Sequence, residues 1–331
     1  MSWRRWLRKL APYLLTLGIV ALLLSQIDPG EILRLLTHLA PAWLAVGWGF
    51  YLLTNVVRAY RFGVLLNLRH PLDILPEMLA LSLFNNTLPS RSGELTFPYF
   101  MYKWHGMSVG ESAAALILAR IFDYLAVGLL FLAFALWQAP HLTPHAAPII
   151  GVTAGLLFVS VLILALTPWL GQWGLRALAW LLRRLGWQEK GWAQKMLRGA
   201  ARMVETFQQL RRVRVYFLTL GWSLLNWLGV FAWFTAFLYA MGAPYPYPFV
   251  VIGATFASLG KAIPFLTVSG FGAHEAGWAV GFGLTGMPLD MAIATGFAVN
   301  ILTLLSSILF GGAALIFMYK IRARRWEESS A

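Results

Sequence analysis

The stretch Asn86-Thr87-Leu88-Pro89-Ser90-Arg91-Ser92-Gly93-Glu94 interrupts a hydrophobic segment where an ordinary membrane helix would carry Leu and Val. A second interruption reads Ile263-Pro264-Phe265-Leu266-Thr267-Val268-Ser269-Gly270-Phe271-Gly272-Ala273-His274-Glu275. Lipid tails cannot satisfy the backbone of a broken helix, so such backbone is buried in protein or lines a wet cavity. A matched pair of breaks in two halves of a chain points to the binding site of a transporter. We therefore expect a membrane protein that handles a polar group inside the bilayer.

The composition indicates the same class of protein. Of the 331 residues, 59% are hydrophobic and 12% are charged, and several apolar runs are long enough to cross a bilayer. The basic residues that give the net charge of +13 lie beside these runs, which is typical of cytoplasmic loops and not of a nucleic-acid surface. The absence of cysteine excludes disulfides and thiolate chemistry. A basic start before Leu10 imitates a signal peptide, but no cleavage site follows it, so we expect a retained first helix.

We predict an all-α integral membrane protein, a polytopic helical bundle that forms a single membrane domain over residues 1–331. Six segments have the pattern of full spans, namely residues 10–27, 41–57, 112–137, 148–170, 216–241 and 288–319. The two interrupted regions, residues 74–105 and 248–286, are expected to be re-entrant hairpins or pairs of short helices.

The distribution of Lys and Arg predicts the orientation of these segments. Basic residues gather at the N-terminus, from Arg58 to Arg69, within 171–214 and after Lys320. By the positive-inside rule, both termini are then cytoplasmic in a bacterial inner membrane, and the two interrupted regions enter from opposite sides. This arrangement predicts two inverted half-repeats, residues 41–170 and 216–319. The basic segment 171–214 between them is expected to form amphipathic helices on the anionic inner leaflet or an ordinary positive loop.

A weak sequence match supports the two halves. Gly106-Met107 follows the first break and precedes a helix that contains Arg120, while Gly286-Met287 follows the second break and precedes a helix with Asn300 at the corresponding place. Inverted repeats are a common plan of transporters, and they place the substrate near the middle of the bilayer.

Charged residues inside the membrane are the main candidates for a binding site, because each is costly unless it meets a partner or water. At the first break, Arg91 could hold a phosphate with its planar guanidinium or simply pair with Glu94. Arg120 and Asp123 lie three positions apart on one helix face, where they neutralise each other or reach the first break. Pro89 and Gly93 mark the interruption of the backbone.

In the second half, Gly270 and Gly272 permit a sharp turn before His274 and Glu275 open the next apolar helix. His274 is a candidate for proton exchange near neutral pH, and Glu275 either caps the helix or accepts a proton. Lys261 has an uncertain depth and could snorkel to the interface.

Three other polar residues are candidates for contacts with a lipid head group. Arg58 and Arg61 end the second span, where they fit a lipid phosphate or a plain anchor at the interface. Asn86, like its neighbour Asn85, binds a head group or satisfies freed backbone carbonyls. We find no nucleotide-binding, metalloprotease or nucleophile-elbow motif, and we assign no metal, cofactor or catalytic residue.

These motifs together resemble a known family. Arg58-Ala59-Tyr60-Arg61, the break from Asn86 to Glu94, Arg120-Ile121-Phe122-Asp123 and the segment from Ser269 to Glu275 are similar to successive motifs of the lysylphosphatidylglycerol synthase transmembrane-domain family. In larger members this region precedes a soluble aminoacyl transferase domain and is regarded as a flippase for the modified lipid. The chain carries no such domain, so we expect no lysyl transfer. The second break lacks the family's usual proline and paired glycines, which leaves the substrate open.

The resemblance and the residues together favour translocation of an anionic or polyprenyl-linked lipid. Arg91 and Arg120 would hold the phosphate, while Glu94, Asp123 and Glu275 would orient the arginines or couple movement to protons. The alternatives are a membrane glycosyl or head-group transferase and an accessory subunit of a lipid-modifying enzyme. The expected partners are a membrane lipid, such an enzyme, and a second copy of the chain in a homo-oligomer; nucleic acid is not expected.

Overall fold

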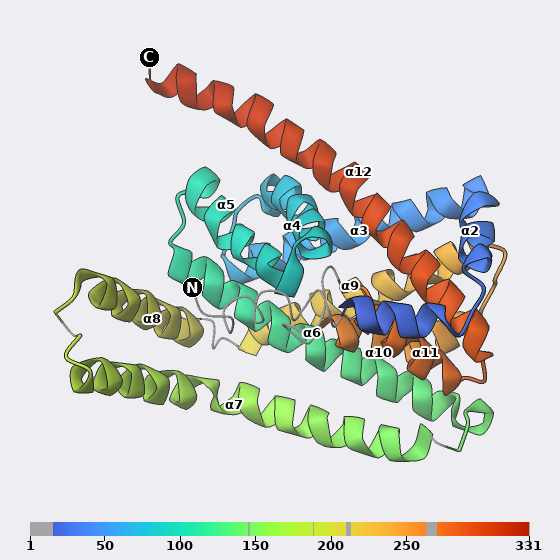
Figure 1. Cartoon of the computed structure of the whole chain (residues 1–331). Helices are drawn as coiled ribbons and strands as arrows, with labels where there is room; N and C mark the ends of the chain where they lie inside the picture. Colours follow the sequence, from blue (N-terminus) through green and yellow to red (C-terminus); the bar gives the residue numbers. More distant parts are fainter. Residues whose placement is uncertain (1–15, 145, 188, 210–212, 263–269, 331) are drawn as a thin grey trace, which may run out of the picture.

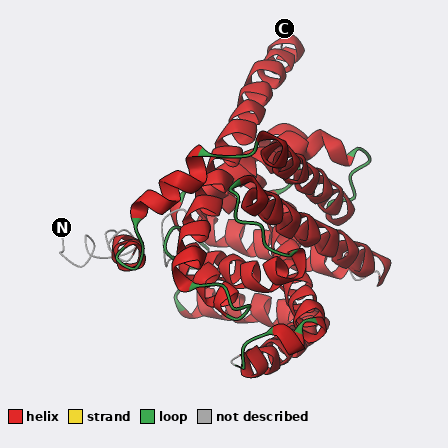
Figure 2. Ribbon diagram, turned by 90° about the vertical axis from the view of Figure 1, so that its right-hand side faces the viewer, coloured by secondary structure: helices red, strands yellow, loops and turns green. Residues whose placement is uncertain are grey.

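The computed structural model describes residues 16–144, 146–187, 189–209, 213–262 and 270–330. Within these ranges the chain consists of helices and loops without a strand (Figure 2). After a helical stretch at residues 16–24, the elements are α2 Pro29–Thr37, α3 Pro41–Leu65, η1 Pro71–Ile74, α4 Leu75–Thr87, η2 Pro89–Leu95, α5 Thr96–His105, α6 Val109–Trp137, η3 Ala139–His141, α7 Ala146–Arg184, α8 Gly191–Gln209, α9 Val213–Ala240, α10 Tyr247–Ala262, α11 Ala273–Gly283 and α12 Leu289–Ser330.

The ends of these helices follow from local chemistry. Asp28 accepts a hydrogen bond from the backbone of Gly30 and caps α2. Ser108 caps α6 by accepting a hydrogen bond from the N–H of Glu111. Gly106 ends α5 with a φ of 65°, a conformation that glycine adopts without strain.

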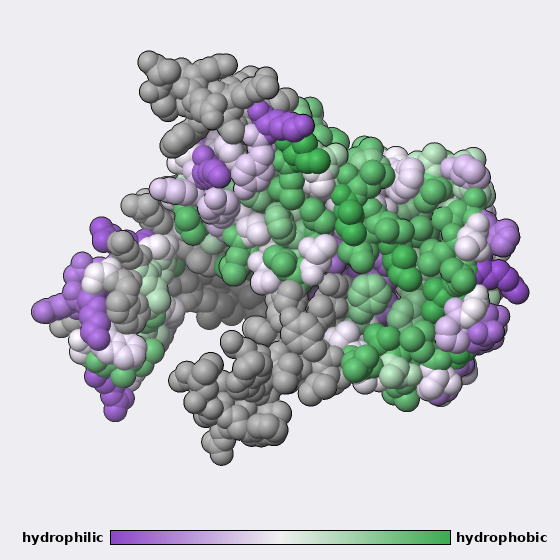
Figure 3. Space-filling view, turned by 45° about the horizontal axis from the view of Figure 1, so that its top comes forward, coloured by the Kyte–Doolittle hydropathy of each residue, from purple (hydrophilic) through white to green (hydrophobic). Residues whose placement is uncertain are grey.

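The all-α polytopic membrane fold is confirmed. Three described helices are long and apolar enough to cross a membrane, Val109–Trp137, Arg214–Ala240 and Leu289–Lys320, and they match three predicted spans. α3 meets this test only together with α2, to which it is bent by 91°. The first predicted span begins among residues that the structure does not describe. Many side chains of the span at 148–170 also lie outside the described part of the chain. Those two spans stay predictions. On the face shown in Figure 3, the described surface of the bundle is largely hydrophobic, and most of the hydrophilic residues lie toward its edges.

α3 and α9 pack side by side in opposite directions through the middle of the molecule. Their ring contacts run in reverse order along the two helices, with centroid separations of 4.7, 4.9 and 5.3 Å for Trp43–Tyr239, Tyr51–Trp233 and Tyr60–Trp222. A Cβ at Gly47 would lie 2.5 Å from the ring of Phe237, so this glycine sets how closely the helices approach. The first long helix of each predicted half thus faces its counterpart.

Each interrupted region is a pair of short helices, one of the two forms predicted for it. In the first, η2 joins α4 to α5, and α4 packs on α12. In the second, α10 and α11 pack closely as an antiparallel pair, and α10 also contacts α6. Gly270 and Gly272 have φ values of 77° and 85°, so they form the sharp turn that was predicted before α11.

The basic segment begins differently from the prediction. Residues 171–184 continue α7 without a break, and α8 then folds back beside it, as Figure 1 shows. Trp173 and Trp180 are exposed on the extension of α7, and the guanidinium of Arg184 lies 5.2 Å from the centroid of the Trp180 ring. An aromatic and basic surface of this kind suits the membrane interface.

Candidate functional site

A cavity of about 210 Å³ lies where α3 and α9 meet both interrupted regions, α6 and α12. The face of α3 that lines the cavity carries residues at helical spacing: Tyr51, Thr54, Asn55, Arg58 and Arg61. The facing side of α9 contributes Asn226, Trp227, Val230, Trp233 and Phe234. The first interrupted region adds Ser82, Asn85, Asn86 and Leu88, and the remaining elements add Arg120, Asp123, Ser258, Lys261, Gly270 and Thr303.

The charged side chains that line the cavity are mostly basic. Among the described residues, those of Arg58, Arg61, Arg120 and Lys261 face it together with one carboxylate, that of Asp123. A buried set of cations needs counter-charge, which the protein or a bound anion must supply.

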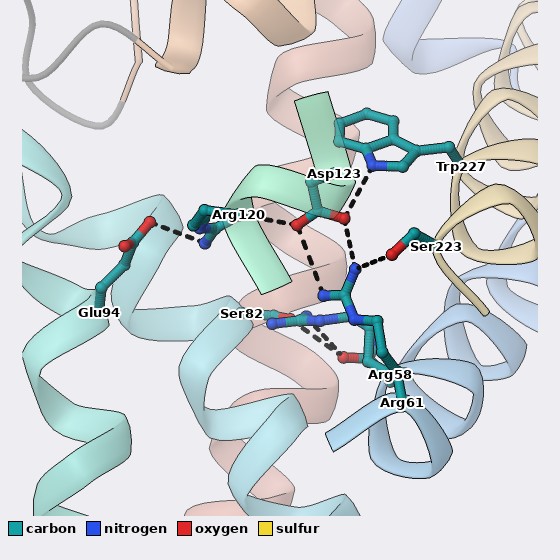
Figure 4. Close-up of polar contacts among 9 residues, drawn as sticks. Arg58, Arg61, Ser82, Glu94, Arg120, Asp123, Ser223 and Trp227 are labelled. Atoms are coloured by element: carbon teal, nitrogen blue, oxygen red, sulfur yellow. Dashed lines mark hydrogen bonds and ion pairs between the residues drawn. The ribbon is translucent and has the colours of Figure 1, made fainter. Parts of the chain in front are cut away.

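Asp123 is the centre of a charged network (Figure 4). Arg61 donates to both of its oxygens and forms an ion pair with it, and Arg61 also donates to the hydroxyl of Ser223 over 3.1 Å. The indole Nε1–H of Trp227 donates to Asp123 Oδ1 over 2.9 Å. The side chains of Arg61 and Asp123 are 3% and 6% exposed, so this pair is sealed inside the protein.

Arg120 connects this network to the first break. Its Nη2 lies 2.7 Å from Oε1 of Glu94 in η2, and its Nη1 lies 3.4 Å from Oδ2 of Asp123 (Figure 4). Both interpretations of the Arg120 and Asp123 pair therefore hold, because Arg120 contacts Asp123 and also reaches the break. The side chain of Arg91 lies outside the described part of the chain, as do those of Pro89 and Ser90. Its role stays a prediction.

Arg58 differs from the other two arginines in its partners. Its Nη1 donates to Ser82 Oγ over 2.6 Å and to Asn55 Oδ1 over 3.2 Å, and both acceptors are neutral. Among the described residues no carboxylate pairs with this guanidinium, so its charge is available to an anion in the cavity.

Gly93, also named as part of the break, sets the distance between the break and α4. A Cβ at Gly93 would lie 2.4 Å from the carbonyl carbon of Phe84.

The second break is held by hydrogen bonds around Glu275. The backbone N–H of Gly272 donates to Oε2 of Glu275 over 2.6 Å, and the amide of Asn300 donates to Oε1 over 2.7 Å. The Nζ of Lys261 donates to Oδ1 of the same Asn300 over 2.7 Å. The capping role of Glu275 is confirmed, and Lys261 reaches inward, so the expectation that it snorkels was wrong.

The contacts of His274 and Asn86 are with other parts of the protein. His274 is buried against Phe234 and Trp278, and neither ring nitrogen has a hydrogen-bond partner within the described ranges. It does not line the cavity. Asn86 does line it, and its amide donates to the backbone carbonyl of Ser82, one turn earlier in α4, over 3.0 Å.

Arg58 and Arg61 were predicted to contact a lipid phosphate or to anchor the span at the interface. α3 runs on to Leu65, beyond the predicted end of the span at 57, and both arginines line the cavity. Sequence reasoning also missed Ser223, which accepts a hydrogen bond from Arg61, and Asn226 and Trp227, which α9 brings to the cavity. The signal that could have found the first two was polar side chains within an apolar span.

The fold and the site define a polytopic α-helical membrane protein with a cationic cavity between two interrupted segments. The family model described as the lysylphosphatidylglycerol synthase TM region matches residues 9–311. The chain belongs to this family, which confirms the resemblance and indicates a membrane role related to lipids. Comparison with curated proteins and with solved structures found no match. Among the residues that the structure describes, no group of three His, Cys, Asp or Glu side chains could hold a metal ion.

Proposed function

We propose that this protein moves an anionic or polyprenyl-linked lipid between the leaflets of the inner membrane. The phosphate of the head group enters the cavity, and the hydrocarbon tails stay in the bilayer. The observation that carries the proposal is the excess of basic side chains in a cavity bounded by both interrupted segments. Membership of a lipid-related membrane family supports it.

In this proposal Arg58 and Arg120 contact the phosphate, and Arg91 joins them from the first break. A guanidinium donates two parallel hydrogen bonds to a phosphate, which favours arginine over lysine for this duty. Asp123 and Glu94 hold the arginines in position, and Glu275 keeps the turn of the second break in place.

The head group enters beside the Arg120–Glu94 pair. The side chains of this pair are 26% and 20% exposed, whereas the neighbouring Arg61–Asp123 pair is almost completely buried. Leu95, directly after Glu94, is 75% exposed and offers an apolar surface to a lipid tail. Because each interrupted segment bounds the cavity, movement of either one would open the site toward the side from which that segment enters.

The test is leaflet exchange of fluorescent lipids in proteoliposomes, with a panel of phospholipids and polyprenyl phosphates. We expect Arg58→Gln and Arg91→Ala to slow exchange of the preferred lipid by about tenfold or more, because each removes charge-assisted hydrogen bonds to phosphate. Arg69→Gln is the matched control, since Arg69 is exposed after α3. Exchange that is unchanged in Arg58→Gln and Arg91→Ala, with each protein present at the normal level, would contradict the proposal. No exchange of any lipid by folded protein would favour a transferase or an accessory subunit.

A further inference from the structure

Asn226 is a buried polar residue whose amide oxygen has no hydrogen-bond partner in the described part of the chain. Its side chain lines the cavity from α9, the residue is 5% exposed, and its Oδ1 has no partner among the described residues. A buried polar atom without a partner costs about 1–3 kcal/mol. Such a group facing a cavity marks a place where a ligand or water completes the hydrogen bonds.

Five other cavity residues carry buried polar atoms without partners in the described part of the chain. These atoms are the amide Oδ1 of Asn85, the indole Nε1 of Trp233, the hydroxyl of Tyr51 and the Nε atoms of Arg61 and Arg120. The amide oxygens only accept hydrogen bonds, and the indole N–H only donates one. A single ligand that serves both kinds of group must therefore both donate and accept hydrogen bonds.

Along α9 the cavity runs from a charged end to an aromatic end. Trp233 lies seven positions after Asn226, or about 10 Å along the helix axis. Along this antiparallel helix pair, Asn226 lies at about the same height as Arg58 of α3. Trp233 packs on Tyr51, with ring centroids 4.9 Å apart. The cavity thus extends from an arginine-rich end to an aromatic end, a length that a phosphate alone does not fill.

Two simple head groups do not fit this arrangement. The free oxygens of a phosphate accept hydrogen bonds, so they cannot serve the amide oxygens of Asn226 and Asn85. An ammonium group could donate to them, but four basic side chains line the same cavity. The carboxylate of Asp123 already accepts hydrogen bonds from Arg61, Arg120 and Trp227, so it is not open to an amine.

We propose that the cavity recognises a phosphate that carries hydroxyl groups, as in a glycerol phosphate or a sugar phosphate, and that Asn226 is the residue that reads the hydroxyls. Hydroxyl groups donate to the amide oxygens and accept from the indole N–H. The aromatic side chains at the far end pack on the carbon skeleton of the polyol. That the ligand is the head group of a lipid rests on the proposed function. The recognition of hydroxyl groups by the cavity does not depend on it.

Binding of water-soluble head groups to the purified full-length protein tests the inference. The probes are sn-glycerol 3-phosphate, glucose 1-phosphate, inorganic phosphate and phosphoethanolamine, each titrated by calorimetry. We expect at least one of the two polyol phosphates to bind about fivefold or more tightly than inorganic phosphate, the factor that one net hydrogen bond gives. Phosphoethanolamine should bind more weakly than the polyol phosphate. The preferred polyol distinguishes a glycerol head group from a sugar-linked lipid.

Asn226→Leu should remove this preference and leave the affinity for inorganic phosphate unchanged. The variant is expected to fold, because none of the side-chain hydrogen bonds between described residues involves Asn226. Leu225→Ala is the matched control, since Leu225 precedes Asn226 on the same helix, is exposed, and is not part of the cavity lining. It should keep the preference for the polyol phosphate.

The outcomes separate this inference from the proposed translocation. Selective binding that depends on Asn226, without exchange of any lipid in proteoliposomes, would support hydroxyl recognition and contradict translocation. Equal affinity for phosphate and polyol phosphates, stronger binding of phosphoethanolamine, no binding of any probe, or an unchanged preference in Asn226→Leu would overturn hydroxyl recognition. In exchange assays, phosphatidylglycerol should move faster than phosphatidic acid, and Asn226→Leu should make the two rates equal.

Discussion

At the scale of single residues, Asp123 holds the cationic side of the cavity together. Its two oxygens accept hydrogen bonds from Arg61, Arg120 and Trp227 between them, and Arg61 comes from a helix far away in sequence. Because the Arg61–Asp123 pair is almost completely buried, the carboxylate and Arg61 need each other more than a surface pair would. Arg58, which lacks such a partner among the described residues, is then the guanidinium left for a ligand.

Asp123→Asn should lower the stability of the folded protein strongly. The change leaves Arg61 buried without a full counter-charge, which costs about 3–5 kcal/mol when one member of a buried pair is removed. Thermal unfolding of the protein in detergent measures the effect. Asp290→Asn is the control, because Asp290 is exposed at the start of α12.

Replacement of both partners tests the cause. Arg61→Met with Asp123→Leu should recover most of the loss, since an apolar pair needs no counter-charge. A stability of Asp123→Asn equal to that of the unchanged protein would show that the pair does not hold the interior.

Part of this site could be predicted from the sequence. Glu94, Arg120 and Asp123 stood out because each is a charge in an apolar region, and the spacing of Arg120 and Asp123 put them on one helix face. The partners of Arg61 and Lys261 could not be predicted, since they depend on which helices pack together. Arg61 meets Asp123 across α3 and α6, and Lys261 meets Asn300 across α10 and α12.

At the scale of elements, glycine fixes the packing of the second interrupted region. A Cβ at Gly281 of α11 would lie 2.1 Å from the carbonyl oxygen of Gly253 in α10. A Cβ at Gly277 would lie 2.4 Å from the carbonyl oxygen of Phe256. Small residues let helix backbones approach closely inside a membrane, where no hydrophobic effect drives helices together. The breaks could be predicted from proline and glycine in the sequence, but this close pairing requires both helices to be placed.

Gly281→Ala should therefore destabilise the α10–α11 pair by about 1–3 kcal/mol, the usual cost of overpacking. The added methyl group meets backbone, which cannot rotate away. Gly283→Ala in the same helix is the control, because nothing lies within 4 Å of its Cβ position. Proteolysis or hydrogen exchange of the detergent-purified protein reports the stability of this pair. Equal protection in the two variants would mean that the contact is not tight.

At the scale of the whole molecule, the glutamates beside the two breaks make corresponding contacts with different charges. In the first, Glu94 beside the break pairs with Arg120 on the following long helix. In the second, Glu275 accepts from Asn300 at the corresponding place, and Lys261 donates to that asparagine. The antiparallel packing of α3 and α9 agrees with halves of opposite orientation. The sequence predicted the correspondence of Arg120 and Asn300, while the shared glutamate contact appears only in three dimensions.

If the halves are inverted, equivalent positions lie on opposite sides of the membrane, and labelling with a membrane-impermeant maleimide can show it. The chain has no cysteine, so a single introduced thiol gives the only signal. Val109 at the start of α6 and Leu289 at the start of α12 are both exposed and hold equivalent places. With cytoplasmic termini, Leu289→Cys should react in intact cells, whereas Val109→Cys should react only after the membrane is opened. Reaction of both thiols from the same side would exclude inverted halves, and the reverse order would place the termini outside.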